Sequence, residues 1–165
     1  MATIDTLASG ANPELVPITV PLSRRQLPQR LIYGFPEFID WINETLPTLT
    51  TGRLRSHMTP QDQLQWIFDK WIAGKTIRYE KMFSDLTPRD EEVWELKTPD
   101  IRIFGWIYKP CFFIAVFGDY ADHYKHPTQI RTYNMARMRV VNARERLNLD
   151  EPKLARGVFD DLVSV

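Results

Sequence analysis

The stretch VWELKTPDIRIFGWIYKPCFFIAVF, residues 93–117, decides the fold class. It consists of short runs rich in β-branched and aromatic residues, separated by the turn-forming triplets TPD and KPC. The pattern predicts three strands, at about 92–97, 101–108 and 111–117. Because consecutive strands joined by tight turns run in opposite directions, we expect an antiparallel meander.

Side chains of the middle predicted strand alternate between two faces of the sheet. One face carries Arg102, Phe104 and Trp106. The opposite face consists mainly of Ile101, Ile103 and Ile107. The strand therefore places an arginine in line with two aromatic residues.

Helical patterns lie on both sides of these strands. Apolar residues within residues 35–46 recur at helical spacing, which predicts a short amphipathic helix. A second helix is expected to begin at the candidate N-cap Thr59, with Pro60 in its first position, and to end near Gly74. Residues 128–147 contain no Pro or Gly and predict a last helix. The sequence thus predicts an α+β fold: N-terminal helices, a small twisted antiparallel sheet and a C-terminal basic helix.

The chain divides into three parts by composition. Residues 1–32 are rich in proline and lack helical periodicity, which indicates an extended arm. Such an arm is either a frayed terminus or a segment that wraps a partner or another subunit. Residues 33–150 are expected to form a single α+β domain, and residues 151–165 a C-terminal tail.

Bulk composition narrows the class of protein. A chain of 165 residues with 44% hydrophobic residues can bury a core without a metal or a disulfide. Cys111 is the only cysteine, so an intrachain disulfide and a cysteine-based zinc site are excluded, and a reducing compartment is favoured. No apolar run is long enough to cross a membrane, and the first 30 residues lack a signal-peptide pattern. We therefore expect a cytoplasmic protein with no membrane partner.

Charge is distributed unevenly although the net charge is zero. Residues 97–146 carry nine Lys/Arg against four Asp/Glu, whereas residues 1–96 carry ten against thirteen. A basic segment in an otherwise acidic chain is compatible with binding to nucleic acid.

The segment GDYADHYKHP, residues 118–127, is the best candidate for chemistry. A histidine side chain in water has a pKa near about 6.5, so His123 and His126 are of the residue type that suits proton transfer at neutral pH. Tyr120 and Tyr124 offer faces on which bases can stack, and Lys125 adds positive charge. The alternative is an ordinary solvated loop. The lysine and the lack of a third neutral ligand argue against a metal at this segment, and no cofactor is expected.

Arginines dominate the last predicted helix. It carries Arg131, Arg137, Arg139, Arg144 and Arg146 against the single acid Glu145. Such a row can follow a phosphate backbone or bind an acidic protein partner. The alternative is that these arginines pair with the acidic N-terminal half of the chain itself.

The order of these features resembles a known family. The run VWELKTPDIRIFGWIY, then CFFIAVFGDY with the KHP loop, then an arginine-rich helix, is similar to the core of phage-derived members of the RelE/ParE toxin superfamily. The resemblance covers roughly residues 60–150. It implies a small twisted antiparallel sheet backed by N-terminal helices. RelE-like members are ribosome-dependent mRNA endonucleases, and ParE-like members act on DNA gyrase.

The resemblance also implies residue roles. Arg102 matches the strand arginine that would hold the scissile phosphate, Lys125 matches part of the loop lysine pattern, and Lys109 is a weaker candidate for phosphate contact. The expected catalytic residues are His123, His126 and Arg102. The expected substrate-binding residues are Lys109, Tyr120, Tyr124, Lys125 and Arg131. The chain departs from the family in having one lysine in the loop, a neutral charge and a long N-terminal extension.

Two functions follow as hypotheses. The first is a RelE-like toxin that acts on RNA, with the ribosome and an antitoxin as expected partners. The second is a non-enzymatic phage or prophage protein that keeps the fold and uses its N-terminal arm to bind a protein partner.

Overall fold

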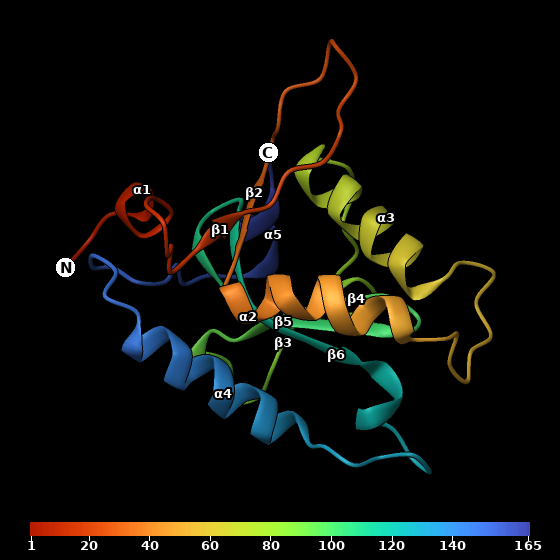
Figure 1. Ribbon diagram of the computed structural model, residues 1–165. Helices are drawn as coiled ribbons and strands as arrows, with labels where there is room; N and C mark the ends of the chain where they lie inside the picture. The colour runs from red at the N-terminus through yellow and green to blue at the C-terminus, as the bar shows by residue number, and fades with distance from the viewer.

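The computed structural model describes all residues, 1–165, and has the predicted α+β class (Figure 1). Six strands form one mixed sheet in the order β1-β2-β6-β5-β4-β3. The strands are β1 (Val16–Pro17), β2 (Leu31–Gly34), β3 (Phe83–Asp85), β4 (Trp94–Lys97), β5 (Ile101–Lys109) and β6 (Phe112–Tyr120). The five α-helices are α1 (Ile4–Leu7), α2 (Pro36–Asp40), α3 (Pro60–Ile72), α4 (Tyr133–Arg146) and α5 (Phe159–Val163).

The sheet is not wholly antiparallel. Strands β3 to β6 form an antiparallel meander, but β2 pairs with β6 in parallel, from Leu31 opposite Phe112 to Gly34 opposite Ala115. Strand β2 has only four residues and follows the proline-rich segment, so its sequence alone did not predict a strand. Its parallel partner is about 80 residues further along the chain, which leaves room for the long crossover that parallel pairing needs.

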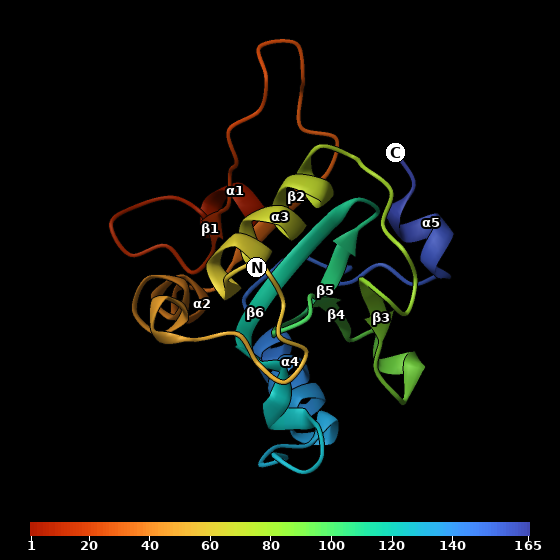
Figure 2. The same cartoon turned by 90° about the vertical axis from the view of Figure 1, so that its right-hand side faces the viewer.

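The helices cover both faces of the sheet (Figures 1 and 2). Helices α2, α3 and α5 pack on one face, where Phe38, Trp71 and Leu162 join Ile103 in a common core. Helix α4 packs on the other face through small and β-branched residues such as Val140. The two faces of β5 divide as its alternation predicted, with Ile101, Ile103 and Ile107 in the first core and Phe104 and Trp106 in the second.

Local sequence signals explain the helix ends. The Thr59 hydroxyl accepts a hydrogen bond from the Asp62 amide, so α3 begins where the N-cap and Pro60 predicted. Helix α4 begins later than predicted, because Thr132 caps it by accepting from the Met135 amide. Helix α2 continues as a π-helical turn, η1 (Trp41–Thr45), and a 3-10 turn, η2 (Leu46–Thr48).

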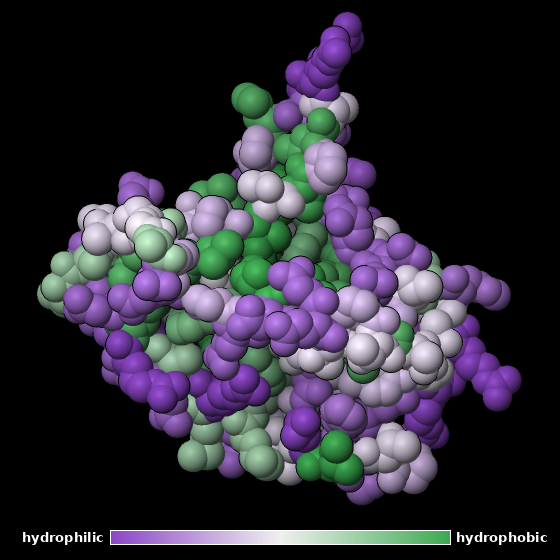
Figure 3. Space-filling view, in the orientation of Figure 1, coloured by the Kyte–Doolittle hydropathy of each residue, from purple (hydrophilic) through white to green (hydrophobic).

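The N-terminal 32 residues are partly folded onto the body. The Ala2 amide donates to the Asn148 carbonyl, and the Ala2 carbonyl accepts from the Asp150 amide. Leu7 and Leu15 are buried in the core on the side of the sheet that α4 covers. Residues 18–30 then form a long loop that projects from the body in Figures 1 and 2. Figure 3 shows a hydrophilic tip on this projecting loop and apolar surface at its base. The tail 151–165 includes α5, whose Leu162 carbonyl accepts from the Cys111 amide.

None of the helices combines the length and the apolar character needed to span a bilayer.

Candidate functional site

The candidate site lies beside the C-terminal part of β6, beyond the point where β2 ends. Strand β2 pairs only with residues 112–115, so the last five residues of β6 have no strand on that side. Helix α2 with η1 flanks this open edge on one face of the sheet, and the N-terminal half of α4 flanks it on the other. Between them is a cavity of about 430 Å³.

Asp119 organises the polar side of the cavity. Its Oδ1 atom lies 2.7 Å from Nδ1 of His123 and accepts from the Tyr120 amide at 2.8 Å. Its Oδ2 atom accepts from the Tyr124 hydroxyl at 2.9 Å and lies 2.6 Å from Nε of Arg131. The carboxylate therefore fixes a histidine ring, a tyrosine and a guanidinium at one place.

The free edges of the His123 and Arg131 side chains remain available to a ligand. Because Nδ1 of His123 is engaged with Asp119, its Nε2 atom is left to exchange protons. The Arg131 side chain is 46% exposed and uses Nε on Asp119, which leaves its two terminal nitrogens for an anion. Burial, followed by the negative charge of Asp119, raises the pKa of Tyr124, so this hydroxyl stays a hydrogen-bond donor.

Aromatic side chains line the rest of the cavity. The Trp41 indole packs closely against β6 because Gly118 has no side chain: a Cβ there would be 2.5 Å from the indole ring. Arg139 stacks over Phe117, with its guanidinium carbon 4.0 Å from the ring centroid, and pairs with Glu37 at 3.1 Å. The Arg139 side chain is half-exposed, so its planar guanidinium offers a surface on which a nucleobase can stack.

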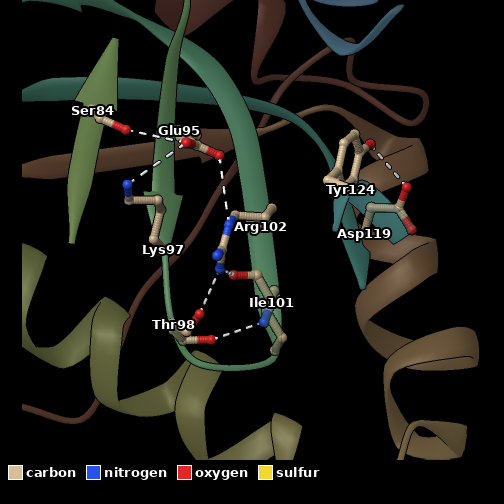
Figure 4. A network of polar contacts seen from close by, with 8 residues as sticks. All are labelled: Ser84, Glu95, Lys97, Thr98, Ile101, Arg102, Asp119 and Tyr124. Atoms are coloured by element: carbon tan, nitrogen blue, oxygen red, sulfur yellow. Dashed lines mark hydrogen bonds and ion pairs between the residues drawn. The ribbon is translucent and has the colours of Figure 1, made fainter. Parts of the chain in front are cut away.

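Arg102 is close to this site in register but does not line the cavity. It lies opposite Asp119 in the β5–β6 pairing, on the same face of the sheet. Figure 4 shows its guanidinium turned away from Asp119, toward Glu95 and the end of the β4–β5 turn. Its Nη1 atom donates to the Thr98 carbonyl at 2.6 Å and to the Ile101 carbonyl at 2.9 Å.

The Arg102–Glu95 pair is buried. The two residues are 6% and 5% exposed, and Nε of Arg102 lies 3.7 Å from Oε2 of Glu95. Burial raises the pKa of Glu95, and the charge of Arg102 lowers it in part. Such a pair is a structural element of the sheet, and the expectation that Arg102 holds the scissile phosphate has no support in its position.

The remaining predicted residues are dispersed. Lys125 is half-buried near Arg102, and burial, then the charge of Arg102, lowers its pKa. His126 is exposed, outside the cavity lining, and its carbonyl accepts from Arg53. Lys109 lies at the other end of β5 and stacks on Tyr108. Of the eight predicted residues, the structure brings four into the cavity lining: Tyr120, His123, Tyr124 and Arg131.

The arginines of α4 mostly bind within the chain. Arg137 pairs with Glu91, and Arg144 is buried and donates to the carbonyls of Glu91 and Glu92. With Arg139 on Glu37, three of the helix's arginines contact the acidic N-terminal half. This favours the second of the two interpretations drawn from the sequence, and helix α4 presents no continuous basic row.

Three residues of the site carry little or no signal in the sequence. In the sequence, Asp119 stands out only as a conceivable metal ligand, although it lies four residues before His123. Trp41 and Arg139 reach the cavity from elements far apart in the chain, so only the fold reveals them. No group of three or more His, Cys, Asp or Glu side chains is arranged to hold a metal ion.

Comparison of the chain with protein-family models gives no match, and neither does comparison with curated proteins or with solved structures. The similarity to RelE/ParE toxins therefore rests on the order of sequence features alone.

Proposed function

We propose that the cavity around His123 binds a single-stranded RNA segment and cleaves it without a metal. The observation that carries this proposal is the Asp119–His123–Arg131 constellation at the edge of an aromatic cavity. It combines an oriented proton acceptor, a cation with free donors and faces for base stacking. These are the groups that phosphodiester cleavage by an internal hydroxyl requires.

In the proposed reaction the ribose 2′-hydroxyl attacks the adjacent phosphorus, and the bond from phosphorus to the 5′-oxygen breaks. Nε2 of His123 takes the proton of the 2′-hydroxyl, and the leaving 5′-oxygen receives a proton from the protonated ring or from water. The products are a 2′,3′-cyclic phosphate and a free 5′-hydroxyl. Asp119 fixes the orientation of the ring through Nδ1, as a carboxylate does beside a catalytic histidine.

Arg131 takes over the role that the family resemblance gave to Arg102. Its side chain lines the cavity and is 46% exposed, so its terminal nitrogens can stabilise the charge that develops on the phosphoryl oxygens. Trp41 and Tyr120 supply surfaces for the flanking bases. His126 and Lys109 have no part in this reaction.

Replacing His123 with alanine is expected to lower the rate of RNA cleavage by about 10²–10⁴-fold, the usual contribution of a general acid–base group. The measurement is cleavage of mRNA in a translating extract and of a labelled single-stranded RNA alone. His57→Ala is the matched control, because His57 is an exposed histidine outside the cavity lining. Equal activity of the two variants, or intact RNA with the unchanged protein, would refute the proposal.

A second candidate function is protein binding through the N-terminal segment. The projecting loop of residues 18–30 carries Leu27, which is 76% exposed, and a cavity of about 210 Å³ at its base is lined by Pro17, Ile18, Val20, Leu31 and Tyr33 among others. Large exposed apolar residues around a cavity are typical of binding surfaces.

Replacing residues 23–27 with a short glycine–serine linker is expected to abolish such binding while the thermal transition of the protein changes little, because Leu22, which packs against the core, is kept. The loop closes at its base through the Gln29 amide, which donates to the Ile72 carbonyl, so the body should fold without its tip. Pull-down with bacterial lysate compares the two proteins. Removal of residues 1–30 is unsuitable, because Leu7 and Leu15 belong to the core. A partner that is retained equally by both proteins would count against this function.

A further inference from the structure

A second cavity lies at the opposite edge of the sheet and shares no residue with the His123 cavity. It has a volume of about 400 Å³ and is formed between β3, β4 and the chain that leads into α5. Its lining includes Tyr79, Asp85, Glu92, Trp94, Phe159 and Asp160. The chain thus places three aromatic rings and three carboxylates around one space.

The aromatic walls are held in fixed positions by the core. Trp94 stacks on Phe83 with ring centroids 4.8 Å apart, and Tyr79 contacts Phe159 at 5.3 Å. Phe83 is fully buried, so the ring that supports Trp94 cannot move aside. A cavity with rigid aromatic walls binds a cation through the electron-rich faces of the rings.

The carboxylates are unequally partnered. Asp85 accepts from the Tyr79 hydroxyl at 2.7 Å and pairs with Arg89 at 3.2 Å, so its charge is balanced. Glu92 makes no side-chain hydrogen bond and no ion pair, although it is only 9% exposed. Asp160 also has no such partner. The lining therefore has two acidic side chains in excess of its one arginine.

The buried Glu92 carboxyl, which has no hydrogen-bond or ion-pair partner, points to a ligand. Burial raises the pKa of this carboxyl, because a charge without a partner is costly in a place with little water. The Trp94 indole N–H, the charge of Arg156 and the Gly157 amide offset part of this effect on the pKa, yet none of the three forms a hydrogen bond or an ion pair with the Glu92 carboxyl. A cation in the cavity would supply the partner that the folded chain does not.

We propose that this cavity binds an organic ammonium ion, with its charge against Glu92 and Asp160 and its alkyl groups against Trp94, Tyr79 and Phe159. The volume suits a small ligand or one side chain rather than a folded segment. A free amine and the lysine side chain of a peptide offer the same chemistry, and the experiment separates them.

The test is a titration of the ¹⁵N-labelled protein, followed through the indole cross-peak of Trp94, which is assigned with Trp94→Phe. Choline chloride probes a free ammonium ion, and a blocked peptide with one lysine probes the side chain. 3,3-Dimethylbutan-1-ol, the neutral isostere of choline, is the control ligand, and ionic strength is held constant with sodium chloride. We expect the cross-peak to shift with at least one cation and not with the alcohol.

Glu92→Gln keeps the shape of the side chain and removes its charge, so it should weaken cation binding about tenfold or more. Asp160 is exposed, so Asp160→Asn folds in any case and should weaken binding less. Asp161→Asn is the matched control on the same helix, outside the cavity lining. Absence of a shift with both cations, an equal shift with the alcohol, or unchanged affinity in both Glu92→Gln and Asp160→Asn would overturn the proposal. RNA cleavage plays no part in these measurements, so they are independent of the His123 site.

Discussion

Gly105→Ala is expected to lower the free energy of unfolding by about 3 kcal/mol or more, because overpacking against backbone cannot be relieved by a change of rotamer. An alanine Cβ at this position would lie 1.9 Å from the Ile114 carbonyl oxygen and 2.9 Å from the Phe113 ring. Gly105 is also where the β5–β6 register shifts, between the two central strands of the sheet. The added methyl group must therefore push these strands apart.

Urea denaturation followed by circular dichroism and tryptophan fluorescence measures this loss. Gly10→Ala is the matched control: Gly10 has nothing within 4 Å of an added Cβ, and its φ of +89° makes alanine unfavourable by only about 1–2 kcal/mol. Equal losses in the two variants would mean that the close approach of β5 and β6 does not exist.

The β5–β6 pair also shows how much the sequence could predict. The alternation of residues 101–107 assigned each side chain to the correct face, since a strand has only two faces and both are buried in this sheet. The cap at Thr59 placed the start of α3, because a side-chain bond to the first turn is a local property. Strand β2 was missed because four residues that pair with a strand about 80 positions away carry no local signal.

For the candidate site, the sequence indicated which residue types could take part, but it indicated poorly which of those residues lie together. The residue types of His123 and Arg131 suit proton transfer and anion binding. No local sequence signal shows that Asp119 is the carboxylate that orients both side chains. The separation of Lys109 from Arg102 could have been foreseen. Seven residues of extended strand span about 23 Å, so the two side chains cannot share one phosphate. The orientation of the Arg102 side chain could not have been foreseen, because it depends on the buried Glu95 of the neighbouring strand β4.

Arg102→Met is expected to destabilise the protein by about 3–5 kcal/mol near neutral pH, because it leaves the buried Glu95 carboxylate with only Lys97, 3.9 Å away, as a cationic partner. The Thr98 carbonyl also loses its donor, whereas the Ile101 carbonyl keeps the hydrogen bond from the Thr98 amide. Urea denaturation gives the size of the loss. The matched double variant Glu95→Gln with Arg102→Met removes the stranded charge and should recover part of the stability.

The pH dependence identifies the cause. Burial already raises the pKa of Glu95, and Arg102 is the strongest group that opposes this, so the variant raises that pKa further. A carboxyl with a raised pKa binds its proton more tightly in the folded state, so stability falls as pH rises from the ordinary glutamate value through the raised one. The deficit of Arg102→Met should therefore be largest near neutral pH and smaller near pH 5. A deficit independent of pH would mean that Glu95 does not cause it.

The same variant tests whether Arg102 takes part in the proposed RNA cleavage or only stabilises the fold. At low temperature, where most of Arg102→Met remains folded, RNA cleavage per folded molecule should stay within about threefold of the unchanged protein, since Arg102 does not line the His123 cavity. Arg131→Met should show the reverse: a smaller loss of stability, because Asp119 keeps its hydrogen bonds from the Tyr120 amide and the Tyr124 hydroxyl, and a loss of about 10²-fold or more in cleavage. If Arg102→Met instead abolished cleavage while fully folded, the strand arginine would hold the phosphate, as the sequence resemblance implies, and Arg131 would not be the cation that stabilises the phosphoryl group.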